Sequence, residues 1–352
     1  MKSRIAEIKN LGQQIWLDNL SRELIKSGSL HKLIEEDDIS GITSNPSIFY
    51  KAISSDINYV NDLEIARKSN KSLEERYESI VIPDIKNSCD EMLKIYNESN
   101  CEAGYVSFEL SPNLAYDAIG SIKHAKRLWI EINRPNLMIK VPATPAGLIT
   151  LEDLISCGIN VNITLLFSIQ QVEDTWNAYI NGLNKRLEKN LPIRNIKSVA
   201  SFFLSRIDTE TDKVVSDELQ GNVAIYLAKY AYSLYLDLFN GKSFENLKKN
   251  GAMPQDLLWA STGTKNPKYS DVLYVESLIG NHTINTVPET TLNAFRDHGN
   301  ANYTLEDNIL YAKRVLDKAN EIINLEKLGE KLQRDGLDLF EKAFNDLIEL
   351  MK

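Results

Sequence analysis

One lysine lies in the middle of a short apolar segment. Residues 136–144 read Asn-Leu-Met-Ile-Lys-Val-Pro-Ala-Thr, which is typical of a buried strand that ends in a turn. Burying an ammonium group without a partner is costly, so Lys140 should pair with a carboxylate or take part in chemistry. A desolvated lysine amine attacks carbonyl carbons and forms Schiff bases. Two simpler interpretations stay open: an ion pair without a chemical role, or a strand that is less buried than its sequence suggests.

Further polar side chains recur toward the carboxyl ends of other apolar segments, where a purely structural core would carry Val, Ile and Leu. Residues two apart on a strand share a face, so several of these side chains point to the same side. They are Asp18, Thr43 and Asn45, Ser107 and Glu109, Asn162 and Thr164, and Ser201 and Phe203, with Arg206 and Lys265 just beyond two of the segments.

Each of these residues also has a structural interpretation. Asn45 precedes a proline and suits a helix N-cap, and both roles are compatible. Asp18 and Glu109 suit ion pairs with Lys140 or Arg206. The remaining amide and hydroxyl groups suit hydrogen-bonded packing inside a core. As a set they are harder to assign to packing, because each buried polar group would need its own partner.

Together the residue types predict a Schiff-base aldol reaction on a phosphorylated sugar. Lys140 supplies the amine, and Glu109, through a water held by Thr164, shuttles the protons of carbinolamine formation and dehydration. Asp18 takes the proton of a substrate hydroxyl and so drives carbon–carbon cleavage. The predicted substrate-binding groups are Asn45, Asn162 and Ser201 for hydroxyls, and Arg206 and Lys265 for a phosphate.

The elements that must position these residues are eight apolar segments separated by helical patterns. This alternation predicts parallel βα units, and eight of them predict a closed (β/α)8 TIM barrel with extra N-terminal and C-terminal helices. A doubly wound open sheet is the alternative, but no GxGxxG follows the first segment. The segments are Gln14–Asp18, Ile39–Asn45, Gly104–Ser111, Leu137–Thr144, Asn160–Phe167, Ser198–Arg206, Asp256–Thr262 and His282–Pro288.

No linker or repeat divides the chain, so we expect residues 1–352 to form a single barrel domain. Its length exceeds the roughly 250 residues of a typical barrel. We assign the excess to the first helix, to a helical insertion at about residues 208–251, and to a C-terminal helical extension at about residues 303–352.

Composition excludes several classes of function. The net charge of −9 argues against nucleic acid as a partner, and no apolar run approaches the roughly 18 residues of a membrane span. The first ten residues lack the apolar core of a signal peptide. Three cysteines and four scattered histidines have no metal-ligand spacing, so we expect no metal, no cofactor and a cytoplasmic location.

The same residues lie in stretches that resemble the transaldolases of the longer bacterial type, within the Schiff-base aldolase superfamily. The resemblance covers about residues 10–350 and is specific only when its pieces are taken together. They are residues 15–20 (IWLDNL), 41–46 (GITSNP), 106–112 (VSFELSP), 139–144 (IKVPAT), 160–168 (NVNITLLFS), 200–206 (ASFFLSR), 259–267 (WASTGTKNP) and 286–291 (TVPETT).

The resemblance implies transfer of a dihydroxyacetone unit between sugar phosphates in the pentose phosphate pathway, without a cofactor, by an enzyme that forms a homodimer. It implies that Lys140 forms the Schiff base, that Asp18 is the acid/base for cleavage, and that Glu109 and Thr164 position the catalytic water. The implied substrate-binding residues are Asn45, Asn162, Ser201, the aromatic Phe203, and Arg206 for the phosphate. Lys265 matches a second phosphate-binding cation, often arginine, more loosely, since the loop after the seventh strand varies in length.

Two rival functions stay open. One is a fructose-6-phosphate aldolase, a relative that releases free dihydroxyacetone; in the family that activity goes with a different water-positioning set from Glu109 and Thr164. The other is a catalytically silent barrel that binds a sugar phosphate for regulation. Intact Lys140, Asp18 and Glu109 speak against the silent barrel.

Overall fold

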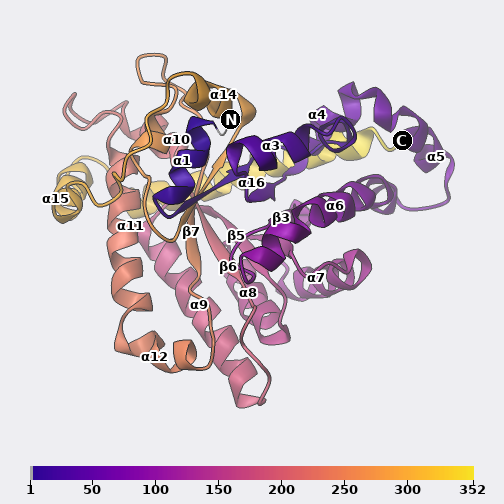
Figure 1. Ribbon diagram of the computed structural model, residues 1–352, viewed down its shortest axis with the longest axis horizontal. Coiled ribbons are helices and arrows are strands. Elements are labelled where there is room, and N and C mark those ends of the chain that lie inside the picture. The colour runs from indigo at the N-terminus through magenta and orange to yellow at the C-terminus, as the bar shows by residue number, and fades with distance from the viewer. Residues whose placement is uncertain (1–2) are drawn as a thin grey trace.

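The computed structural model describes residues 3–352, and within them eight parallel strands close into a barrel in sequence order (Figure 1). The last strand pairs with the first, so the predicted barrel is confirmed and the open sheet is not found. The strands are β1 Gln13–Leu17, β2 Gly41–Thr43, β3 Tyr105–Glu109, β4 Leu137–Pro142, β5 Val161–Leu166, β6 Ser198–Phe203, β7 Asp256–Ala260 and β8 Thr283–Val287.

Helices surround the barrel. Among the described residues, none of them combines the length and the hydropathy that a membrane crossing requires. They are α1 Arg4–Asn10, α2 Arg22–Lys26, α3 Ser29–Asp37, α4 Pro46–Ser55, η1 Ile57–Tyr59, α5 Val60–Lys68, α6 Leu73–Glu98, η2 Pro112–Leu114, α7 Ala118–Ile132, α8 Pro145–Cys157, α9 Ile169–Glu188, α10 Ser205–Thr211, α11 Val223–Phe239, α12 Lys242–Lys249, α13 Leu273–Glu276, α14 Glu289–His298, α15 Ile309–Asn320 and α16 Leu325–Glu349.

The predicted strands were too long at their carboxyl ends. Asp18, Asn45 and Arg206 follow their strands rather than ending them, and Arg206 already belongs to α10. The reason is that β-rich composition does not separate the last strand residue from the loop that follows it. These loops carry the polar groups at the barrel rim.

Local capping ends several strands abruptly. Asn45 and Thr144 each accept a hydrogen bond from the backbone N–H three residues on, and a proline occupies the first turn of α4 and of α8. Ser168 caps α9 in the same way, while the Gln171 side chain accepts a hydrogen bond from the N–H of Phe167, the residue before the cap. The start of each of these helices therefore lies only a few residues after the end of the preceding strand.

The β5 strand is irregular at its carboxyl end. Its register with β6 shifts between Ile163 and Leu166, and Leu165 has a φ of +62°. A left-handed backbone is unusual for a leucine and costs free energy, so it persists only where the surroundings hold it. The irregular residue comes directly after Thr164.

The stretch predicted as an insertion holds α10, α11 and α12. Of these, α11 contacts α9 and β7, which is the position of an ordinary outer barrel helix. The stretch predicted as a C-terminal extension holds α15 and α16. Figure 1 shows α16, in yellow, as a long helix that runs from the side of α10 toward α4, and it contacts both as well as β5. The division into one domain with these additions stays a prediction.

Candidate active site

A cavity of about 270 Å³ opens at the carboxyl ends of the strands, where active sites of (β/α)8 barrels lie. All the predicted site residues except Glu109 and Asn162 line it. Its lining residues are Asp18, Thr43, Asn45, Ser47, Lys140, Thr164, Ser201, Phe203, Arg206, Ala260, Ser261, Thr262, Gly263, Lys265, Thr286, Pro288 and Phe340.

Lys140 lies at the bottom of this cavity and is 4% exposed. The register of the sheet places Glu109 of β3 opposite it, and the Glu109 Oε2 atom is 3.2 Å from Lys140 Nζ. Lys140 Nζ also donates a hydrogen bond of 3.2 Å to the carbonyl of Ser44. Burial raises the pKa of Glu109 above its usual range, and the Lys140 charge offsets only part of that shift. A carboxyl group with a raised pKa, 3.2 Å from an amine, suits proton exchange with that amine.

The second carboxylate, Asp18, follows β1 and reaches the same cavity. Its Oδ1 accepts a hydrogen bond of 2.7 Å from the Thr43 hydroxyl, which lies 2.6 Å from the hydroxyl of Thr286. Burial raises the pKa of Asp18, while Lys140, the Thr43 hydrogen bond and Lys265 act in the opposite direction. Asp18 is thus held in a fixed orientation by strands on either side of it.

Two buried oxygen atoms near the lysine have no hydrogen-bond partner among the described residues. They are Thr164 Oγ1 and Glu109 Oε2. Glu109 Oε2 forms an ion pair with Lys140, but the angles of that contact are not those of a hydrogen bond. Buried hydroxyl and carboxyl groups in proteins are nearly always hydrogen-bonded to protein or water. The pair therefore offers an acceptor and a donor to a water or a substrate group.

The three predicted hydroxyl-binding residues are placed differently from one another. Asn45 caps α4 through its Oδ1 and lines the cavity, so both of its proposed roles are compatible. The Ser201 hydroxyl lines the cavity and donates to Asn162 Oδ1 at 2.7 Å. Asn162 is fully buried behind Ser201, and its amide nitrogen donates to Ser107 at 3.0 Å. Its amide supports neighbouring side chains instead of facing the open cavity.

Two cationic side chains, Arg206 and Lys265, line the cavity. The guanidinium carbon of Arg206 lies 5.8 Å from the centre of the Phe203 ring. The Arg206 side chain makes no hydrogen bond or ion pair with the described residues. Burial lowers the pKa of Arg206, with partial compensation from Asp335. Lys265, on the loop after β7, also lines the cavity and is exposed. Two cations that make no hydrogen bond or ion pair with the described residues suit a dianion such as a phosphate ester.

Sequence reasoning missed several lining residues. Among them, Thr286 of β8 and Phe340 of α16 were not singled out as site residues, although Thr286 lies in the stretch 286–291 that resembles the family. Lys140 Nζ lies 5.7 Å from the centre of the Phe340 ring. Nothing in the local sequence marks Phe340, because its place depends on where α16 crosses the barrel.

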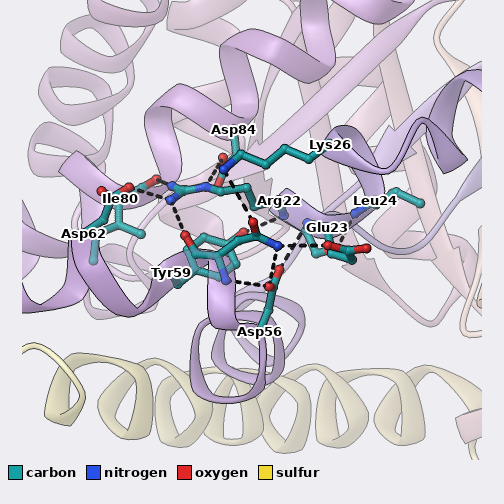
Figure 2. A network of polar contacts seen from close by, with 11 residues as sticks. Arg22, Glu23, Leu24, Lys26, Asp56, Tyr59, Asp62, Ile80 and Asp84 are labelled. Carbon is teal, nitrogen blue, oxygen red and sulfur yellow. Dashed lines mark hydrogen bonds and ion pairs between the residues drawn. The ribbon is translucent and has the colours of Figure 1, made fainter.

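A buried arginine anchors the segment that follows Asp18 (Figure 2). Arg22, at the start of α2, binds Asp84 of α6 at 3.0 Å and Asp62 of α5 at 2.5 Å, and its guanidinium lies 4.4 Å from the Tyr59 ring centre. The backbone N–H of Arg22 donates to the Tyr59 hydroxyl at 2.8 Å. This network ties α2 to helices α5 and α6 only four residues after the catalytic candidate.

One group outside the cavity has the composition of a metal site. Ligand atoms of Glu74, Glu78 and His124 lie within 4.8 Å of one another. However, Glu78 already binds His124 at 2.8 Å and Arg127 at 2.5 Å, which accounts for its charge. The absence of a metal requirement stays a prediction.

The fold and the site together define a (β/α)8-barrel enzyme built around a buried lysine. The family model described as Transaldolase/Fructose-6-phosphate aldolase matches residues 15–351. A protein named Transaldolase from Thiobacillus denitrificans is 46% identical over 350 residues, covering 97% of this chain and 98% of the relative. Proteins of the same name from Neisseria gonorrhoeae and Trichodesmium erythraeum are 46% and 44% identical, each covering at least 97% of both chains. The chain belongs to the transaldolase/fructose-6-phosphate aldolase family.

Proposed function

We propose that this enzyme is a transaldolase that moves a dihydroxyacetone unit between sugar phosphates. The donor is sedoheptulose 7-phosphate or fructose 6-phosphate, and the acceptor is glyceraldehyde 3-phosphate or erythrose 4-phosphate. The observation that carries the proposal is the buried amine of Lys140, 3.2 Å from the Glu109 carboxyl group in a cavity that Asp18 also enters. The full-length relatives named Transaldolase support the same conclusion.

The first half of the reaction forms the imine. The Glu109 carboxylate accepts a proton from Lys140, and the free amine attacks the C2 carbonyl of the ketose to give a carbinolamine. Through a water held by the unpartnered Thr164 hydroxyl, Glu109 then returns a proton to the C2 hydroxyl, which leaves as water, and an iminium forms. The raised pKa of Glu109 supports this role, because a carboxyl group that holds its proton more tightly works as an acid near neutral pH.

The second half exchanges the aldose. Asp18 takes the proton of the C4 hydroxyl, the C3–C4 bond breaks, and its electron pair moves toward the iminium to give an enamine. The first aldose phosphate leaves with its new aldehyde. The enamine carbon then attacks the aldehyde of the second aldose phosphate, Asp18 returns the proton to the new hydroxyl, and water releases the ketose.

Substrate binding is assigned by charge and hydrogen-bonding capacity. We place the phosphate at Arg206 and Lys265, whose side chains make no hydrogen bond or ion pair with the described residues. Asn45 and Ser201 line the cavity with groups suited to the polyol hydroxyls, and Phe203 forms an apolar wall beside them. Asn162, whose amide is bonded to Ser107 and Ser201, acts on the substrate through Ser201.

Borohydride trapping tests the proposal. With fructose 6-phosphate and borohydride, the protein should gain the mass of one reduced dihydroxyacetone adduct on Lys140. Lys140→Ala should gain no such mass and lose turnover entirely, while its far-ultraviolet spectrum stays that of the parent. Lys185→Ala, at an exposed lysine of α9, is the matched control and should retain trapping and turnover. Near-normal turnover in Lys140→Ala would refute the assignment.

The aldolase rival is separated by following the products. A transaldolase moves dihydroxyacetone to erythrose 4-phosphate and releases little of it free, whereas a fructose-6-phosphate aldolase releases it without an acceptor. The relatives named Transaldolase and the Glu109–Thr164 pair favour transfer. A silent sugar-phosphate-binding barrel would give neither product and no borohydride adduct.

Three further assignments complete the proposal. We place the enzyme in the cytoplasm, which the small number of cysteines favours. We expect a homodimer of single-domain chains, to be checked by light scattering at several protein concentrations. We expect full activity after treatment with a chelator, because the proposed steps need only side chains of this chain.

A further inference from the structure

The side chain of Gln333 reaches from α16 to the carboxyl ends of two neighbouring strands. Its Nε2 donates one hydrogen bond of 3.0 Å to the carbonyl of Ala143 and another of 3.1 Å to the carbonyl of Leu165. An amide nitrogen has two hydrogens, so both donors are used. The opposite amide orientation would set an oxygen against two carbonyl oxygens, which fixes the assignment of the nitrogen.

These two carbonyl groups lie on either side of a backbone hydrogen bond between β4, which carries Lys140, and β5, which carries Thr164. Ala143 follows β4, three residues after Lys140, and its N–H donates to the carbonyl of Thr164 at 2.8 Å. Leu165 comes directly after Thr164. Gln333 therefore ties both sides of the Ala143–Thr164 hydrogen bond to one helix.

The backbone at this point needs such support. Leu165 has a φ of +62°, and residues 164 and 165 lie in the register shift between β5 and β6. A left-handed leucine keeps its conformation only where contacts over-determine it. Gln333 donates a hydrogen bond to the Leu165 carbonyl, which lies within the register shift at the end of β5.

The rest of the helix face fits the same position. A Cβ atom on Gly336 would lie 2.9 Å from the Leu165 side chain and 3.4 Å from Arg206, so glycine lets α16 approach the strand end closely. Phe340, one turn further, lines the cavity and lies 5.7 Å from Lys140 Nζ. The face that carries Gln333 thus belongs to the wall of the site.

We propose that Gln333 is a positioning residue for imine formation. By fixing the Leu165 carbonyl it sets the orientation of Thr164, whose buried and unpartnered hydroxyl holds the water exchanged with Glu109. Gln333 is not among the residues that line the cavity, so it acts through the backbone it holds. This inference rests on the proposed roles of Lys140, Glu109 and Thr164.

Gln333→Met removes both donors at nearly constant side-chain length. We expect kcat to fall about tenfold to a hundredfold, because a displaced catalytic group of this kind costs that much, with little change in KM for the ketose phosphate. Time-resolved borohydride trapping should show slower imine formation in proportion to kcat. Glu341→Met, which puts the same side chain on the exposed face of α16, is the control and should match the parent.

A double-mutant cycle separates positioning from general loosening. If Gln333 acts through Thr164, Gln333→Met should slow imine formation in the parent but have little further effect in Thr164→Val. Independent, multiplying effects of the two substitutions would overturn the inference. So would a rise in KM with kcat preserved.

Gln333→Glu provides a second measurement if the methionine variant folds poorly. Its ionised carboxylate cannot donate to either carbonyl group, but the protonated acid donates to one. The rate of trapping, taken relative to the parent at the same pH, should recover as the pH falls. A ratio that does not change with pH would overturn the inference. If the parent itself gains no adduct, the proposed function fails. If the parent gains the adduct and both Gln333 variants gain it as fast as the parent, only this inference fails.

Discussion

At the scale of single residues, burial does most to set the chemistry of the site. Asp18 and Glu109 both have a pKa raised by burial, although each faces the positive charge of Lys140. Holding ionised carboxyl groups there lowers the stability of the fold. A site that keeps two such acids beside an amine therefore trades stability for reactivity.

Asp18→Asn should lower turnover and raise thermal stability. We expect turnover to fall about 10²- to 10⁴-fold, the usual contribution of a general acid or base, and the thermal midpoint at neutral pH to rise. The unfolded aspartate has a pKa of about 3.9, below that of the folded state. As the pH rises past that value, the unfolded state loses its proton first, so the parent loses stability relative to the amide variant.

The measurement is a set of melting curves for both proteins from about pH 4 to about pH 8. The gain of the variant should be absent near pH 4, grow as the pH increases, and level off above the folded pKa. Asp338→Asn, at an exposed aspartate of α16, is the control and should follow the parent. A gain that is largest at low pH would contradict the assigned direction.

At the scale of elements, short ion pairs hold the segments that carry site residues. Arg22 is 8% exposed and binds Asp84, which is itself buried, while Asp62 is partly exposed (Figure 2). The network joins α2, which begins four residues after Asp18, to α5 and α6. Its loss should affect both stability and the placement of Asp18.

Arg22→Met should lower the free energy of unfolding by about 3–5 kcal/mol, because it leaves the Asp84 carboxylate buried without its cationic partner. Turnover should fall less than in Asp18→Asn, since Asp18 keeps its Thr43 hydrogen bond. Chemical denaturation and steady-state kinetics measure the two effects. Asp62→Asn, on the exposed side of the network, should cost less than about 1 kcal/mol. Equal losses in the two variants would show that burial is not the deciding factor.

At the scale of the whole molecule, the two ends of the barrel have different tasks. The carboxyl ends of the strands carry the cavity. At the amino ends, Lys197 is 1% exposed and binds Asp256 at 2.6 Å and Glu102 at 2.8 Å. Burial lowers the pKa of Lys197, but the two carboxylates outweigh it and raise the pKa overall. This cluster joins the starts of β6 and β7 to the loop before β3.

Lys197→Met should therefore separate stability from activity. We expect the free energy of unfolding to fall by about 3–5 kcal/mol because Asp256 loses its buried cationic partner and keeps only the Tyr235 hydroxyl, while kcat and KM below the unfolding temperature stay at parent values. Denaturation and kinetics on the same preparation measure this. Lys249→Met, at an exposed pair within α12, should change stability by no more than about 0.5 kcal/mol. A loss of kcat in folded Lys197→Met would contradict the division of tasks.

Much of the architecture could be predicted because its signals are local. The eight strands, their order and the helix starts at Pro46 and Pro145 follow from apolar runs and caps a few residues long. The strand ends could not be placed to the residue. Composition is the same on both sides of such a boundary, and only the hydrogen-bond ladder decides it.

By itself, the sequence determined that one amine lies inside an apolar strand, with two carboxyl groups and two cations near strand ends, and from these it predicted the groups of the proposed chemistry. Only the tertiary structure decided which polar groups face the cavity, since Asn162 lies behind Ser201 while Thr286 and Phe340 line the wall. It also decided what covers the strand ends. Gln333 meets Ala143 across 190 residues of chain, and no local pattern encodes a contact that depends on the path of the whole backbone.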